Sequence, residues 1–148
     1  MSDRVTVSVI KADVGSVGGH ARPHPLMMKR AEERLADGLR AGTIDDFYVT
    51  RVGDDINLFL THTRGENNRD VHGLCWEAFM DATREAKRMK LYAAGQDLLT
   101  DAFSGNVRGA GPGAAEMEFK ERGAEPLVFF MADKTEPSSY SLPLCKTY

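Results

Sequence analysis

Residues 47–60 read FYVTRVGDDINLFL, two short apolar runs separated by the Gly-Asp-Asp turn at 53–55. Short runs of β-branched and aromatic residues around a Gly/Asp turn are typical of a β-hairpin. The stretch therefore predicts strands over 47–52 and 56–60. It also places two carboxylates, those of Asp54 and Asp55, next to each other where the hairpin turns.

The segments before this hairpin predict one strand and one helix. Apolar and polar residues alternate over 5–9, which is the period of a half-buried strand. A glycine-rich loop follows over 14–20, and Pro23 and Pro25 then mark a helix entrance. The helix is expected to continue at helical spacing and to stop at Gly42. Its apolar positions are Met28, Ala31, Leu35 and Leu39.

The segments after the hairpin predict a second helix and two more strands. Apolar residues keep one helical face over 71–89. Four glycines in 104–113 indicate a loop, 115–119 is expected to be a strand, and the continuous apolar run over 127–132 is typical of a central strand buried on both faces. The order strand, helix, hairpin, helix, strand predicts an α+β fold: a mixed β-sheet with two main helices packed on one face.

Composition narrows the class of protein. The 148 residues are 42% hydrophobic and 28% charged, which is ordinary for a globular domain. A net charge of −3 argues against a nucleic-acid-binding surface, and the longest apolar run is far below the roughly 20 residues of a membrane-spanning helix. The N-terminus lacks the pattern of a signal peptide. With two cysteines only, one of them at a helix-core position, we expect a reduced, cytoplasmic protein.

The acids of the chain fall at expected strand ends. Asp13 follows the first strand, Asp54 and Asp55 lie in the hairpin turn, and Asp133 follows the apolar run. Carboxylates that converge on one sheet edge repel one another and require a cation, and oxygen ligands favour Mg²⁺, Mn²⁺ or Ca²⁺. Taken singly, each acid is more often explained by turn chemistry or helix capping. The four together make a metal site and coincidence equally good explanations, and composition and spacing do not decide between them.

Other candidates carry weaker signals. The glycine-rich loops at 15–19 and 104–113 offer backbone N–H groups suited to phosphate, yet glycine loops are more often plain connections. His20 is commonly solvated and less commonly a ligand. Lys134 suits a phosphate contact or a surface position. Tyr92, Gln96 and Asp97 are equally well explained as the end of the second helix, capped by Gly95.

Four motifs, taken together, resemble the bifunctional fructose-1,6-bisphosphate aldolase/phosphatase family of archaea and deep-branching bacteria. They are SVIKADVGSVGGH, RVGDDINLFLTHTRGE, LYAAGQDLLTDAFSGNVRGAGPG and FMADKTEP, and they run in family order from residue 8 to residue 137. Several long motifs in one order are more specific than any single signature. The resemblance covers nearly the whole chain.

The resemblance implies a role for each matching residue. Asp13 would bind Mg²⁺ and act as the general base for phosphate removal. Metal ligands would be Asp13, His20, Asp54, Asp55, Gln96 and Asp133. Substrate contacts would be His20, Tyr92, Gly105, Asn106 and Lys134.

The resemblance also implies a reaction and an assembly. The family condenses dihydroxyacetone phosphate with glyceraldehyde 3-phosphate to fructose 1,6-bisphosphate and then hydrolyses the 1-phosphate, giving fructose 6-phosphate for gluconeogenesis. Several Mg²⁺ ions take part, and the family forms homo-oligomers, octamers in particular. Residues 1–148 would be the N-terminal portion of one larger domain with layered α-β-β-α architecture.

The resemblance leaves part of the machinery outside the sequence. The family's Schiff-base lysine, its catalytic tyrosine and further acidic ligands belong to a later portion, so we expect the metal and phosphate half-site here without aldolase activity. Two alternatives stay open. One is a non-catalytic module that binds metal and sugar phosphate, and the other is a structural fragment that needs partner chains to fold.

Overall fold

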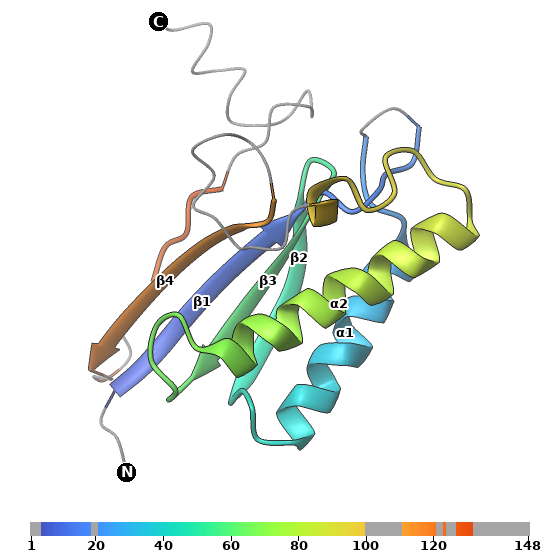
Figure 1. Ribbon diagram of the computed structural model, residues 1–148. Coiled ribbons are helices and arrows are strands. Elements are labelled where there is room, and N and C mark those ends of the chain that lie inside the picture. The colour runs from blue at the N-terminus through green and yellow to red at the C-terminus, as the bar shows by residue number, and fades with distance from the viewer. Residues whose placement is uncertain (1–3, 19–20, 100–110, 121–122, 124–126, 132–148) are drawn as a thin grey trace, which may run out of the picture.

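A computed structural model describes residues 4–18, 21–99, 111–120, 123 and 127–131 (Figure 1). Four strands and two long helices form the described fold, in the order β1 α1 β2 β3 α2 β4, with a short 3-10 helix, η1, before β4. Some residues singled out in the sequence lie outside the described residues. They are His20, Gly105, Asn106, Asp133 and Lys134.

The strands form one sheet in the order β2-β3-β1-β4. Their bounds are Arg4–Ala12 for β1, Asp46–Val52 for β2, Asp55–His62 for β3 and Gly113–Lys120 for β4. Each described pair of neighbours is antiparallel. β1 and β2 therefore run in the same direction with β3 between them, which is the split βαβ arrangement of a βαββαβ chain.

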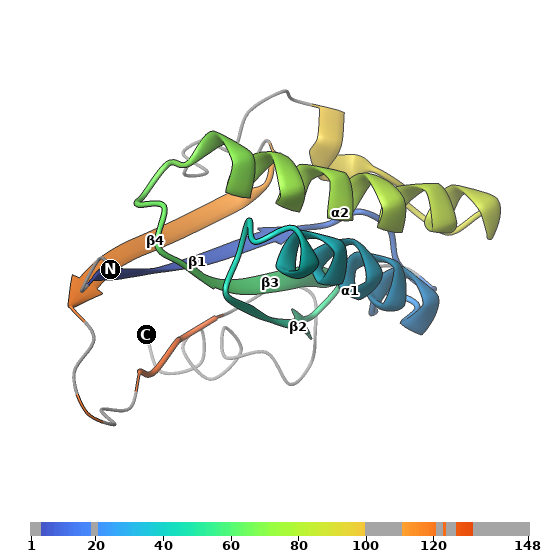
Figure 2. The same ribbon diagram turned by 90° about the horizontal axis from the view of Figure 1, so that it is seen from below.

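Both helices pack on the same face of the sheet (Figure 2). α1 (Pro25–Arg40) begins with a proline in its first turn, where the missing N–H costs no hydrogen bond. α2 (Arg69–Arg88) is capped by Asn68, whose side chain accepts hydrogen bonds from two backbone N–H groups of the first turn. The predicted α+β class, with two helices on one face, is confirmed.

The core lies between this sheet face and the helices. Side chains alternate along a strand, so every second residue of β1 and β3 faces the helices. Ile10, Ile56 and Leu58 are completely buried there. The opposing helical residues are also buried, and the free thiol of Cys75 lies among them. Burial of this apolar surface is the main stabilising contribution to the fold.

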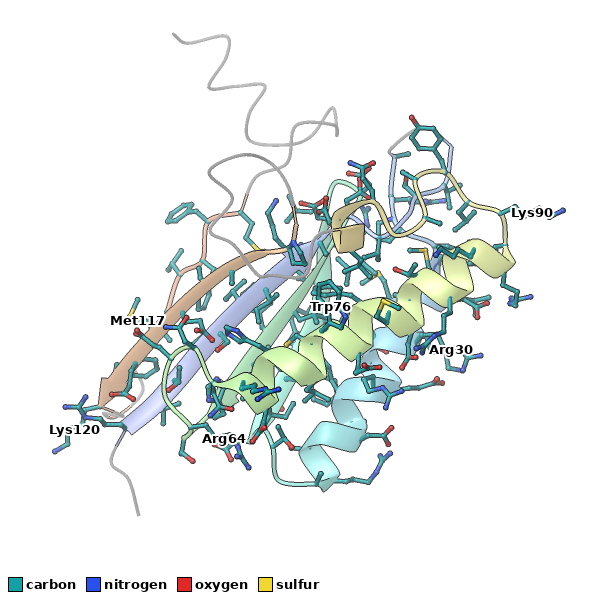
Figure 3. The ribbon with its side chains drawn as sticks, viewed as in Figure 1. Arg30, Arg64, Trp76, Lys90, Met117 and Lys120 are labelled. Carbon is teal, nitrogen blue, oxygen red and sulfur yellow. The ribbon has the colours of Figure 1, made fainter. Side chains whose placement is uncertain are left out.

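Ion pairs join the two helices on their outer side. Arg34 Nε lies 2.7 Å from a carboxylate oxygen of Asp81, and Arg30 Nε lies 3.6 Å from one of Glu85. Figure 3 shows Arg30 beside the seam between α1 and α2. Since these arginines are partly exposed, each pair adds at most about 1 kcal/mol to stability.

Two expectations about the sheet differ from the structure. The described strand pairs are all antiparallel, so this part of the sheet is not mixed. The predicted central strand over 127–132 is wrong for 127–131, which form no strand and lie on the sheet face opposite the helices (Figure 2). There the ring of Phe129 meets that of Phe59 edge-on at 5.2 Å, while Phe130 is 92% exposed. A continuous apolar run signals apolar contact, and it does not specify backbone pairing.

Among the described residues, no helix combines the length and the apolar character that a membrane span requires.

Candidate metal centre

Three carboxylates meet where the C-terminal end of β1 lies beside the hairpin turn. Asp13 directly follows β1, Asp54 lies in the turn, and Asp55 opens β3. The pairing register explains the meeting, because Ala12 at the end of β1 lies opposite Ile56 at the beginning of β3. Antiparallel pairing therefore brings residues 41 and 42 positions apart in the sequence to the same end of the sheet.

The three side chains are close together and removed from solvent. One carboxylate oxygen from each lies within 4.8 Å of the other two. The exposed fractions are 5% for Asp13, 1% for Asp54 and 7% for Asp55. Carboxylates at this spacing and burial repel one another strongly unless a proton or a cation compensates their charge.

The electrostatics of Asp13 reflect that repulsion. Burial raises the pKa of its carboxyl group from 3.8 to about 7, and the negative charges of Asp54, Asp55 and Asp97 act in the same direction. A hydrogen bond from the Gly15 backbone N–H, at 3.2 Å, opposes the shift and is outweighed. In the absence of a cation, the cluster therefore holds a proton at a pH where an ordinary aspartate has lost it.

The loop after Asp13 is held tightly against the rest of the fold. Gly15 has φ of +130°, and a Cβ atom there would lie 2.9 Å from the Cβ of Ala86 and 3.2 Å from the Cα of Ala94. A side chain at position 15 would therefore require both strain and displacement of α2. Glycine at this position lets the loop pass close to α2 while its N–H group donates a hydrogen bond to the Asp13 carboxylate.

Sequence analysis missed the second support, which comes from Asp97 in η1 (Gln96–Leu99). The Asp13 backbone N–H donates to Asp97 Oδ2 at 2.8 Å, and the Asp97 N–H donates to the Asp13 carbonyl at 3.0 Å. Gly95 N–H donates in addition to the Val14 carbonyl at 2.9 Å. The residues are 84 positions apart, and the local signal was an acid two residues after Gly95, which the sequence suggested as a helix cap although α2 ends at Arg88.

The chemistry of this site fits a hard divalent cation. Three buried carboxylates provide the oxygen ligands that Mg²⁺, Mn²⁺ and Ca²⁺ prefer. Asn57, two residues after Asp55 on the same face of β3, is completely buried, and its Oδ1 atom has no hydrogen-bond partner within the described part of the chain. An orphaned carbonyl-type oxygen beside clustered carboxylates adds a donor of the type such cations accept.

Two further predicted site residues, Tyr92 and Gln96, belong to the segment that forms hydrogen bonds with the loop after β1. Gln96 is exposed. Its neighbours Gly95 and Asp97 donate backbone hydrogen bonds to the loop at 13–14. The Tyr92 carbonyl accepts a hydrogen bond from Ser16 N–H at 3.0 Å, and its side chain is 57% exposed. These backbone contacts tie the segment 92–97 to the loop that carries Asp13.

Comparison with known proteins adds independent evidence. A family model described as fructose-1,6-bisphosphatase matches residues 4–148. A protein of Ignicoccus hospitalis named fructose-1,6-bisphosphate aldolase/phosphatase is 59% identical over 148 residues, which is 100% of this chain and 38% of that protein. Proteins of the same name are 58% identical in Pyrobaculum neutrophilum, over 98% of this chain and 37% of the relative, and 51% identical in Moorella thermoacetica, over 100% and 38%.

The chain thus spans about two fifths of the length of these relatives. The motifs that suggested the resemblance and the carboxylates of the metal centre all lie within the matched residues.

Proposed function

The chain belongs to the fructose-1,6-bisphosphatase family, and on that premise we propose that it carries the metal and phosphate half-site of a Mg²⁺-dependent fructose-1,6-bisphosphate aldolase/phosphatase. The single observation that supports this most is the group of Asp13, Asp54 and Asp55, buried and with ligand oxygens within 4.8 Å. A buried cluster of negative charge without a cation is costly, and a Mg²⁺ ion there would also attract a phosphate.

The proposed ligands are the three clustered aspartates together with His20, Gln96 and Asp133. When bound, Mg²⁺ would neutralise the phosphate and lower the pKa of a coordinated water. Asp13 is proposed as the general base: its carboxylate takes the proton of the attacking water. Gly15 N–H donates to the Asp13 carboxylate and Asp97 holds the Asp13 backbone, so that the carboxylate keeps its direction during proton transfer.

Substrate binding is proposed for His20, Tyr92, Gly105, Asn106 and Lys134. The relatives' name gives fructose 1,6-bisphosphate, and from the family resemblance we propose triose phosphates as its aldol precursors. For the complete protein we propose a place in gluconeogenesis, a cytoplasmic location and a homo-oligomeric assembly. Residues 1–148 would form the N-terminal portion of its single larger domain.

Phosphate release tests the proposal directly. We expect release of phosphate from fructose 1,6-bisphosphate to require Mg²⁺, and Asp13→Asn to abolish it, because asparagine cannot accept the water proton. Glu118→Gln, toward the opposite end of β4 from the metal centre, is the matched control, and it should leave the rate unchanged. Mg²⁺-independent release, or full activity of Asp13→Asn, would contradict the assignment of Asp13.

The aldolase half of the reaction is proposed to need residues outside 1–148, among them the Schiff-base lysine. Incubation with dihydroxyacetone phosphate and borohydride should therefore leave no covalent adduct on the chain, as measured by mass spectrometry. An adduct on any lysine would overturn this part of the proposal.

A second function would use the same three buried carboxylates without catalysis. In that reading the chain is a non-catalytic module that binds metal and sugar phosphate. Calorimetry then distinguishes the two. Mg²⁺-dependent binding of fructose 1,6-bisphosphate without phosphate release would support the module, and binding with release would support the phosphatase.

A further inference from the structure

Lys11 lies beside the metal centre on the face of the sheet opposite the helices. It is the residue before Ala12 at the end of β1, and its Cα partners are Asn57 on β3 and Gly113 on β4. Because side chains alternate along strands, Lys11, Asn57 and Asp55 all project from that same face.

The ammonium group of Lys11 reaches one member of the carboxylate cluster. Its Nζ atom lies 2.5 Å from Asp55 Oδ2, with side-chain exposures of 36% for the lysine and 10% for the aspartate. A hydrogen-bonded ion pair in which the acid is nearly buried is shorter and stronger than one at the open surface. It fixes the direction of the Asp55 carboxylate.

The aliphatic stem of Lys11 lies beside Gly113 on the neighbouring strand β4. A Cβ atom built on Gly113 would lie 3.4 Å from Lys11 Cγ and 3.6 Å from its Cε. A Cβ atom at position 113 would therefore touch the aliphatic stem at ordinary van der Waals distance, and a larger side chain there would reach further toward it. Gly113 keeps an extended backbone without positive φ, so freedom of the main chain does not explain the glycine. The structure shows instead that the lysine stem lies next to the position where a side chain of residue 113 would begin.

A second contact holds Asp55 through its backbone. The Nδ2 atom of Asn57 donates to the Asp55 carbonyl at 3.3 Å. Together, the Asn57 amide fixes the main chain of Asp55 and the Lys11 ammonium fixes its carboxylate. Neither residue was among the sequence candidates, and neither needs to touch a metal ion to influence its binding.

From this arrangement we propose that Lys11 is a positioning residue of the metal centre, which holds the Asp55 carboxylate next to those of Asp13 and Asp54 before a cation arrives. The proposal rests on the proposed function, because it assumes that the cluster binds a divalent metal. Asp55 is repelled by its neighbours and turns toward solvent unless something retains it. Lys11 retains it, at the cost of placing a positive charge near the cation.

Binding of Mn²⁺ alone, measured by electron paramagnetic resonance, tests the proposal without any assay of activity. We expect Lys11→Met to weaken Mn²⁺ binding about tenfold or more, the usual loss when a partner that orients a metal ligand is removed. Lys11→Arg keeps the cation and should restore most of the affinity. Thermal melting of the metal-free variants, with midpoints near that of the wild type, would show that loss of the fold is not the cause.

A variant that leaves all charges in place separates position from charge. Gly113→Val should crowd the lysine stem and also weaken Mn²⁺ binding, whereas Ala115→Val, two residues further on the same face of β4, should not. If the wild type binds no Mn²⁺, the proposed function fails and this inference fails with it. If the wild type binds but Lys11→Met binds equally well or more tightly, only the inference is overturned, since Lys11 would then act as a surface ion pair or a repelling charge.

Discussion

Two sites beside β1 hold acids, and the charge of these acids is treated in opposite ways. At the end of the strand, the pKa of Asp13 is raised to about 7 by burial and by neighbouring carboxylates. At mid-strand, on the helix-facing side, Glu116 of β4 lies opposite Ser8. Burial alone would raise the pKa of Glu116, but hydrogen bonds from Ser8, Asn67 and His72 outweigh it, and the pKa is lowered.

The Glu116 cluster satisfies its charge with donors from the protein. Ser8 Oγ and His72 Nε2 donate to Glu116 Oε1 at 2.6 and 3.0 Å, and the Asn67 backbone N–H donates to Oε2 at 2.6 Å. His62 completes the chain: Arg64 N–H donates to its Nδ1, so its Nε2–H donates to Ser8 Oγ at 2.8 Å. Burial lowers the pKa of His62 and keeps its ring neutral, as this arrangement requires.

The difference separates a structural acid from a ligand. An acid surrounded by donors stabilises the fold as a carboxylate and needs nothing from outside. Acids surrounded by acids destabilise the fold as carboxylates until a cation binds. The following predictions are in order of decreasing effect, and each should affect the two clusters differently.

Divalent metal should stabilise the chain through the Asp13 cluster only. At a free Mg²⁺ concentration of about 100 times Kd, the free energy of unfolding should rise by about 2.7 kcal/mol. Urea denaturation with and without Mg²⁺ measures this rise. The variant Asp54→Asn should lose most of it and Glu116→Gln should keep it. Equal stabilisation of both variants would mean that the metal binds elsewhere.

Neutralising Glu116 should destabilise the metal-free chain. Glu116→Gln removes a charged acceptor and turns an amide N–H₂ toward donors, so we expect a loss of about 2 kcal/mol in the free energy of unfolding at pH 7. Glu118→Gln on the same strand, whose partner Arg4 is largely exposed, should cost less than about 1 kcal/mol. Equal losses in the two variants would show that the hydrogen bonds of Glu116 contribute no more to stability than the exposed ion pair of Glu118.

Neutralising Asp13 should change the free energy of unfolding in the opposite direction and stabilise the metal-free chain. At pH 8 without metal, Asp13→Asn should stabilise the chain by about 1 kcal/mol, which is less than the pKa shift implies because asparagine accepts a weaker hydrogen bond from the Gly15 N–H than the carboxylate does. The wild-type Asp13 is protonated in the folded state below pH 7, so its cost appears as the pH rises from about 4 to about 7 and is complete above that.

The pH dependence of the two acids therefore differs in direction. The gain from Asp13→Asn should vanish near pH 4. The stabilisation from Glu116 is complete above its unfolded pKa and is lost only as the pH falls through its lowered folded value. Denaturation of wild type and both variants from pH 3 to pH 8 checks both trends. Parallel curves for the two variants would contradict the contrast.

The smallest effect is expected at Asp97. Its charge contributes least among the acids that raise the pKa of Asp13. Asp97→Asn keeps an acceptor for the Asp13 N–H, so the pKa of Asp13 should fall slightly and stability should change by about 0.5 kcal/mol or less. Carbonyl chemical shifts recorded against pH measure the pKa. A rise in the pKa of Asp13 would contradict the claim that the charge of Asp97 repels the Asp13 carboxylate.

The elements of the fold were predictable because their signals are local. The proline near the entrance of α1, the turn at 53–55 and the apolar face of α2 each specify structure within a few residues. The meeting of Asp13 with Asp54 and Asp55 was also predictable, since acids at strand ends converge once the strands pair.

Other features depend on contacts that no local pattern encodes. Asp97 reaches Asp13 only because the segment after α2 returns to the loop behind β1. Ser8 and Glu116 meet only through the β1–β4 register. The apolar run at 127–131 gave a false strand because its side chains contact the outer sheet face without backbone pairing.

The most direct test of the account is the position of a bound metal. Crystals of the chain soaked in Mn²⁺ should give an anomalous peak about 2 Å from carboxylate oxygens of Asp13, Asp54 and Asp55, and none at Glu116. A peak at Glu116, or no peak among the three aspartates at saturating Mn²⁺, would contradict the claim that these acids are gathered for a cation.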